Sequence, residues 1–185
     1  IGYAQFYNVI FNNSNLVATI NANGMTAANN VTFTALTTLN GGNLNVRGSI
    51  WFNDAAWNGN SKIVLFGLVA QFINGTGVCG VSVEVCPTSG SVNLNSNLTL
   101  TGASSDLIMT NGQFNCGSYT VTLPRSFIIT SGTFNANNSI FNFIGAAPTI
   151  TVNQYQPFYK LTLNNPSMVL TSTSNTIVNS ILTLT

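Results

Sequence analysis

The sequence repeats itself without a gap at an offset of 20 residues. Residues 110–123 (TNGQFNCGSYTVTL) align with residues 130–143 (TSGTFNANNSIFNF), so that Phe114 falls on Phe134 and Asn115 on Asn135. A unit this short cannot bury its apolar side chains alone, and it becomes stable only when neighbouring units stack on it. This repeat constrains the fold more than any other feature of the chain.

Two further segments, 89–100 and 41–52, share the string Gly-x-apolar-Asn-apolar with this pair. Their apolar positions can be extended in steps of 20 to 24 residues along most of the chain. The predicted equivalent positions are Ile20, Leu44, Leu68, Val92, Phe114, Phe134 and Phe158. The pattern predicts a single repeat domain over residues 1–185, interrupted by an insertion at 53–88 where the repeat is hard to see.

Each unit consists of short runs in which apolar and polar residues alternate. Such runs, separated by Asn-Gly, Ser-Gly and Asn-Asn, are typical of half-buried strands joined by tight turns. No segment shows a sustained helical period with caps. We therefore expect an all-β fold, a parallel β-solenoid of about eight coils of 20–24 residues. An antiparallel β-sandwich, which also has short strands at regular spacing, is the alternative.

The composition agrees with stacking. Only seven of 185 residues are charged (four Lys or Arg, three Asp or Glu), whereas Asn, Thr and Ser number 29, 23 and 17. In a stack of like residues a repeated charge repels itself, while amide and hydroxyl side chains hydrogen-bond along the axis.

The same composition removes several functional classes. There is no His, and the three carboxylates, Asp54, Glu84 and Asp106, lie far apart in sequence, so we expect no enzyme activity, metal site or cofactor. Four basic residues are too few to neutralise a nucleic-acid backbone. The longest apolar stretch, 63–73, is too short to span a bilayer. Because the chain begins at Ile1 without Met, we expect a mature exported chain or a fragment.

Cysteine spacing suggests an oxidised pair. Cys79 and Cys86 flank an apolar segment that would bring them within disulfide range if it folded back on itself; two buried thiols are the alternative. Cys116 has no nearby partner and is expected to be a small core residue. Possible N-glycosylation sequons occur at Asn12, Asn30, Asn74, Asn97 and Asn137.

A second repeat relates the two ends of the chain. Residues 6–17 (FYNVIFNNSNLV) resemble residues 158–169 (FYKLTLNNPSMV), and the chain closes on an alternating strand at 181–185. The first eleven residues carry no charge, and none follows Lys160, although monomeric proteins usually protect such strand edges with charge, Pro or a cap. The predicted polymerisation interface comprises Tyr3, Phe6, Val9, Phe11, Ile181, Leu182 and Leu184.

Exposed aromatic side chains are candidate contacts for a glycan or another surface, because sugars stack on flat rings. Trp51, Trp57 and Tyr155 are the candidates. Trp51 lies in an alternating strand and is expected in the core, whereas Trp57 lies in the polar segment 54–60 and is the better candidate.

Residues 132–185, with GTFNANNSIFNF and FYKLTLNN, resemble the Asn/Thr-rich strand-repeat proteins of bacterial cell surfaces. The resemblance extends well over 89–185 and loosely over 1–52. It implies a secreted β-solenoid of the adhesin or autotransporter-passenger kind, and that family has no catalytic residues to transfer.

Two functions follow as expectations. The first is a structural subunit of an extracellular, cell-surface filament that assembles head to tail through its uncapped terminal strands. The second is a stalk or binding segment of a larger adhesin that contacts surfaces or polysaccharide.

Overall fold

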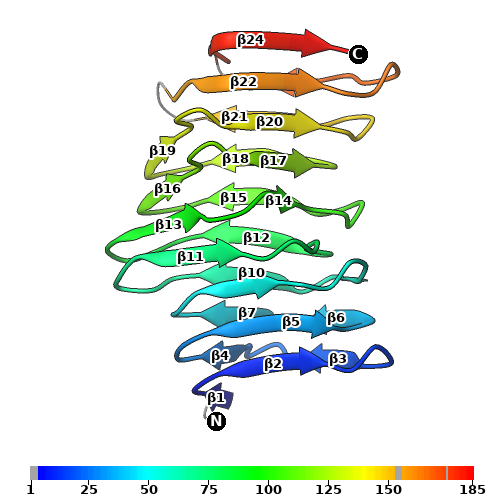
Figure 1. Cartoon of the computed structure of the whole chain (residues 1–185), viewed down its shortest axis with the longest axis vertical. Helices are drawn as coiled ribbons and strands as arrows, with labels where there is room; N and C mark the ends of the chain where they lie inside the picture. The colour runs from blue at the N-terminus through cyan, green and yellow to red at the C-terminus, as the bar shows by residue number, and fades with distance from the viewer. Residues whose placement is uncertain (1–3, 153–155, 174) are drawn as a thin grey trace.

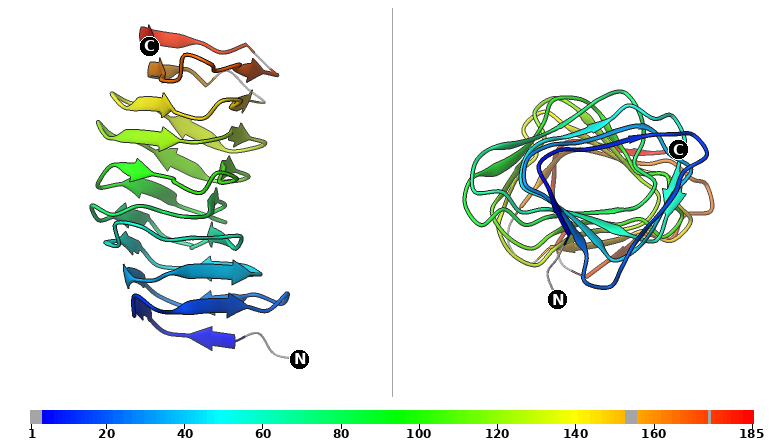
Figure 2. Two further views of the ribbon diagram at one scale, coloured as in Figure 1. Left: turned by 90° about the vertical axis from the view of Figure 1, so that its right-hand side faces the viewer. Right: turned by 90° about the horizontal axis from the view of Figure 1, so that it is seen from below.

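The computed structural model describes residues 4–152, 156–173 and 175–185, and the fold within them is all-β. Twenty-four short strands, with no helix among the described residues, stack as a parallel β-solenoid of about eight turns (Figure 1). The predicted fold class is confirmed, and the antiparallel sandwich is excluded because every strand pair runs parallel. β1 and β24 lie at opposite ends of the stack (Figure 2).

The coils run over three walls in a fixed order, A, B and then C, and the last two coils place their described strands on walls A and C alone. Wall A contains β1 (Ala4–Phe6), β4 (Met25–Ala27), β7 (Asn43–Val46), β10 (Lys62–Leu65), β12 (Ser82–Val85), β15 (Leu107–Met109), β18 (Phe127–Ile129), β21 (Thr149–Val152) and β23 (Thr171–Ser172). Wall B contains β2 (Val9–Asn12), β5 (Val31–Ala35), β8 (Ile50–Phe52), β11 (Gln71–Asn74), β13 (Ser91–Leu94), β16 (Gln113–Asn115) and β19 (Thr133–Asn135).

Wall C is divided into two sheets. The first has β3 (Val17–Ile20), β6 (Thr38–Gly41) and β9 (Asn58–Gly59). The second has β14 (Leu98–Thr99), β17 (Thr120–Leu123), β20 (Ile140–Phe143), β22 (Phe158–Leu163) and β24 (Val178–Leu184). Between them the fourth coil contributes only Cys79, which forms an isolated parallel bridge with Leu100.

The gap-free repeat is the true register of the stack. Phe114 pairs with Phe134 on wall B, and Val121 pairs with Phe141 on wall C. Partners on wall A lie from 19 residues apart (Met25 and Leu44) to 24 (Val83 and Leu107), close to the predicted 20–24.

The extended set of equivalent positions is only partly correct. Val92, Phe114 and Phe134 form one column on wall B, but Leu44 lies on wall A and Leu68 is exposed at a corner. Ile20 and Phe158 both lie on wall C. All three walls use the same alternating pattern, so the spacing alone cannot say which wall a segment occupies.

Residues 53–88 do not interrupt the stack, contrary to our expectation of an insertion. β10 pairs with β7 on one side and β12 on the other, and β11 lies between β8 and β13 in the same way. The segment was hard to align because its corners differ in length and sequence, while its strands keep the common pleat.

Inward-facing side chains of successive coils form one continuous core. At the N-terminal end Phe33 stacks between Phe11 (ring centroids 4.8 Å apart) and Trp57 (4.7 Å). Gln71, a buried amide of wall B, accepts from Gly67 N and donates to Val46 O and Gly48 O, so it links two neighbouring coils at the corner between walls A and B.

Asparagines form a ladder on the outer face of wall B, as the composition led us to expect. Asn115 Nδ2 donates to Asn93 Oδ1 at 2.7 Å, and Asn135 Nδ2 donates to Asn115 Oδ1 at 2.7 Å. These residues pair directly across β13, β16 and β19. The ladder ties three coils together through side chains as well as backbone.

We predict that Asn115→Ala lowers the free energy of unfolding by about 1–3 kcal/mol, because two side-chain hydrogen bonds of about 0.5–1.5 kcal/mol each are lost. Urea denaturation followed by circular dichroism measures this. The matched control is Asn111→Ala at an exposed position beside β16, which should change stability by less than about 0.5 kcal/mol. Equal losses in the two variants would show that the ladder contributes nothing specific.

Candidate functional site

The N-terminal end of the solenoid exposes part of its own core. Phe6 pairs with the buried Ala27 and therefore points inward, yet it is exposed because no coil lies beneath it in the described chain. Val9 is half-buried, and Phe11 is buried against Phe33. These three predicted interface residues lie together on the first coil, whereas Tyr3 falls outside the described residues.

The C-terminal end is more open. Leu182 and Leu184 pair with Leu161 and Leu163, so both point inward, and both are exposed, Leu184 by 69%. Ile181 pairs with Lys160 on the outer face and is 48% exposed. β24 lies at the edge of its sheet, with a strand on one side only.

A side chain covers the neighbouring edge of wall B. The Gln156 amide accepts from Phe134 N and donates through Nε2 to Gly132 O at 3.0 Å. It thereby occupies backbone groups within and just before the last strand of wall B, β19, that a further strand would otherwise bind. Wall C has no such cover over β24 among the described contacts.

The similar segments 6–17 and 158–169 form the same kind of turn but lie on different walls of the solenoid. Asn13 Oδ1 accepts from Asn15 N at 3.0 Å, and Asn165 Oδ1 accepts from Ser167 N at 2.9 Å. The preceding strands, however, are β2 on wall B and β22 on wall C. The two ends therefore share a strand-and-turn motif but not a position in the coil.

Charged side chains all lie between Arg47 and Lys160. Lys62 forms an ion pair with Glu84 on the next coil, and Arg125 Nε lies 3.4 Å from Asp106 Oδ1. Arg47 and Lys160 lie over the rings of Phe66 and Tyr159. The first two coils and β24 thus carry no charged side chain.

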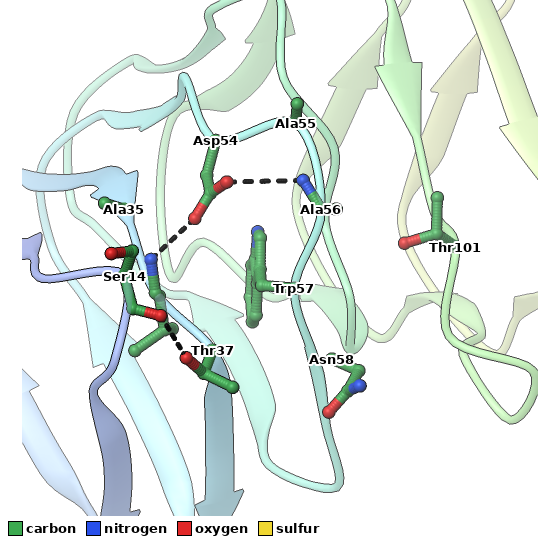
Figure 3. Close-up of a pocket in the computed structure, with 10 residues that line it drawn as sticks. Ser14, Ala35, Thr37, Asp54, Ala55, Ala56, Trp57, Asn58 and Thr101 are labelled. Atoms are coloured by element: carbon green, nitrogen blue, oxygen red, sulfur yellow. Dashed lines mark hydrogen bonds between the residues drawn. The ribbon is translucent and has the colours of Figure 1, made fainter.

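A cavity of about 590 Å³ lies beside the predicted contact residue Trp57 (Figure 3). Asp54 at its rim accepts hydrogen bonds from Leu36 N at 2.6 Å and from Ala56 N at 3.2 Å, so both carboxylate oxygens bind backbone N–H groups. Trp57 itself is only 5% exposed, and its Nε1 donates to Val78 O at 2.7 Å. The prediction of Trp57 as a surface contact is wrong, because its ring stacks on Phe33 in the core.

Trp51 shows the opposite error. Ile50 and Phe52 point inward from β8, so Trp51 between them points outward and is half-buried, although we expected it in the core. It lines a shallow cavity of about 350 Å³ with Asn8, Asn30 and Asn53. Because residues 50–52 are all apolar, the sequence does not show which of them face inward. The pairing of β8 with β5 does. Tyr155 lies outside the described residues.

The expected disulfide is not formed, and Cys79 and Cys86 are both free thiols. The segment between them does not fold back: residues 82–85 run extended as β12 and separate the bridge of Cys79 on wall C from Cys86 at the next corner. Cys116 is buried, as expected of a core residue. Burial raises the pKa of the Cys79 thiol to about 12, opposed in part by a hydrogen bond with the Val81 backbone, and burial also raises the pKa of Cys116.

The sequons differ in accessibility. Asn12 and Asn137 are exposed, whereas the half-buried Asn30 and Asn74 hold backbone atoms of neighbouring coils. Asn97 is exposed, but its Oδ1 accepts from Thr120 N at 2.9 Å. Glycosylation at any of them remains a prediction.

The described residues form no helix that is long and apolar enough to cross a bilayer. Within the described ranges no three His, Cys, Asp or Glu side chains come together in a way that could hold a metal ion. Comparison with protein-family models, curated proteins and solved structures gave no match to this chain.

We predict that iodoacetamide at pH 8 modifies Cys86 alone in the folded protein, because Cys79 and Cys116 are buried and remain protonated. Mass spectrometry should find one adduct before denaturation and three after it, and Cys86→Ser should remove the native adduct. If Cys86 reacts only after reduction, the disulfide exists and the structure of this segment is wrong.

Proposed function

We propose that this chain is a structural subunit of an extracellular, cell-surface filament in which one solenoid stacks head to tail on the next. The observation that carries the proposal is the open core at both ends. Phe6 at one end and Leu182 and Leu184 at the other occupy inward columns and remain exposed.

Stacking a second copy would bury these side chains as each coil buries those of its neighbour, with a gain of about 25 cal/mol per Å² of apolar surface. The two ends are different surfaces, so the contact is heterologous and repeats without closing, which produces a fibre. The absence of charge from the first two coils and from β24 removes the usual protection against such growth. The extracellular location rests on the resemblance to bacterial surface strand-repeat proteins.

The alternative is a segment of a longer adhesin, in which further coils of the same chain cover the ends. The outward Trp51 beside Asn8, Asn30 and Asn53 favours this function, since an indole face and amide groups suit a carbohydrate. If so, Trp51→Ala should abolish binding on a glycan array, while the buried Trp57 makes no direct contribution. An array without any Trp51-dependent signal would remove the support for this alternative.

We predict that Leu184→Lys prevents filament formation by the purified chain, because it places an unpaired charge in the apolar column that the next copy would cover. Electron microscopy and sedimentation measure assembly, and circular dichroism checks that the fold is kept.

Leu68→Lys is the matched control. Leu68 is exposed by 68%, almost as much as Leu184, but lies at a corner in the middle of the stack. The control should assemble like the parent chain. The proposal fails if the parent remains monomeric at all concentrations, or if both substitutions have the same effect on filaments.

A further inference from the structure

The free strand edges at the two ends of the solenoid indicate how one copy would pair with the next, and we call this contact the joint. We infer that β24 of one copy pairs in parallel with β3 of the next, in the register Ile181–Val17, Leu182–Ala18, Thr183–Thr19 and Leu184–Ile20. This inference rests on the proposed head-to-tail assembly and names the surface through which it occurs.

β24 is the most suitable edge at the C-terminal end. It has seven residues, whereas β23 on wall A has two, and the wall B edge at β19 is occupied by the Gln156 amide. At the opposite end, β3 is the edge strand of the first sheet of wall C. Both strands belong to the same wall, and all strands of a wall run in the same direction, so simple stacking brings them together in parallel.

The pleat allows only certain registers. Leu182 and Leu184 face inward because they pair with Leu161 and Leu163. Ala18 also faces inward, since it pairs with the buried Leu39. Inward residues must meet inward residues, because a shift of one residue would turn a whole strand inside out.

Among the remaining registers, the outer face selects one. Val17 is 58% exposed and Ile181 48%, and the inferred register sets these two apolar side chains beside each other on the outer face. It also sets Thr183 over Thr19, which continues the outward polar row of the second sheet of wall C. That row is Thr99, Thr122, Asn142, Thr162 and Thr183.

Shifts by two residues match less well. One direction sets Ser180 against Ala18 and carries Leu184 beyond the end of β3. The other sets Leu184 against Ala18 and carries Leu182 beyond the start of β3. Charge agrees with a second copy as the occupant: the strands facing each other carry none, and the nearest charged side chain, Lys160, lies on the strand below β24.

The test is disulfide trapping between copies. Thr19→Cys and Thr183→Cys are combined in one chain with Cys86→Ser, which leaves only buried native thiols. In the inferred register the two new cysteines face each other across neighbouring strands about 4.8 Å apart, within disulfide range. They belong to β3 and β24, which lie at opposite ends of one solenoid (Figure 1), so only an intermolecular bond can form. Mild oxidation should give a ladder of covalent multimers on a non-reducing gel.

Thr19→Cys with Thr185→Cys is the off-register control. Thr185 has the same outward parity as Thr183 but lies two residues further on, which puts the pair about 8 Å apart by strand rise and spacing, beyond disulfide reach. A ladder from the Thr183 pair and its loss in the Thr185 pair support the joint.

The remaining outcomes separate this inference from the proposed function. Filaments in micrographs without covalent multimers, or with stronger trapping by the Thr185 pair, overturn the joint and leave the assembly proposal standing. Monomers in micrographs and no trapping overturn both.

Discussion

Stacking is the interaction on which this structure depends. Each coil places its apolar side chains inward, and only the coils above and below keep water from them. Wall B shows the principle, where Val92 is covered by Phe114 of the next coil and Phe114 by Phe134 of the one after. A solenoid can end such a stack only with a cap, with another chain or with exposed core. At β24 the described residues end it with exposed leucines.

The scarcity of charge follows from the same constraint. Outward residues stack as regularly as inward ones, so the chain uses side chains that bond to their own kind, as Asn93, Asn115 and Asn135 do. Six of the seven charged side chains lie beside an opposite charge or a ring, as Lys62 does with Glu84, and the seventh, Asp54, binds backbone N–H groups. The scarcity of charged residues thereby reflects how the stack is held together.

The sequence predicted the fold where one strand-turn-strand unit recurred without a gap. The alignment of Phe114 with Phe134 and of Val121 with Phe141 is the register of two walls at once. It could not assign isolated strands to walls, because the three walls share one alternating pattern, and so Leu44 was placed on the wrong one. The predicted orientations of Trp51 and Trp57 were reversed for a related reason. Whether a strand residue faces inward depends on how the strand pairs, and a mostly polar segment such as 54–60 can still place one ring in the core. The disulfide prediction was wrong because the spacing of two cysteines in sequence does not reveal that the residues between them form an extended strand.

The most direct measurement is the axial rise of filaments formed by the purified chain, obtained by helical reconstruction from electron micrographs. Wall A contributes nine strands per copy. A continuous solenoid therefore predicts a rise of about 43 Å per copy and a layer line near 4.8 Å at the usual strand spacing. Filaments with a clearly different rise, or with copies joined side to side, would contradict stacking through open ends. Discrete particles of a single copy would contradict assembly altogether.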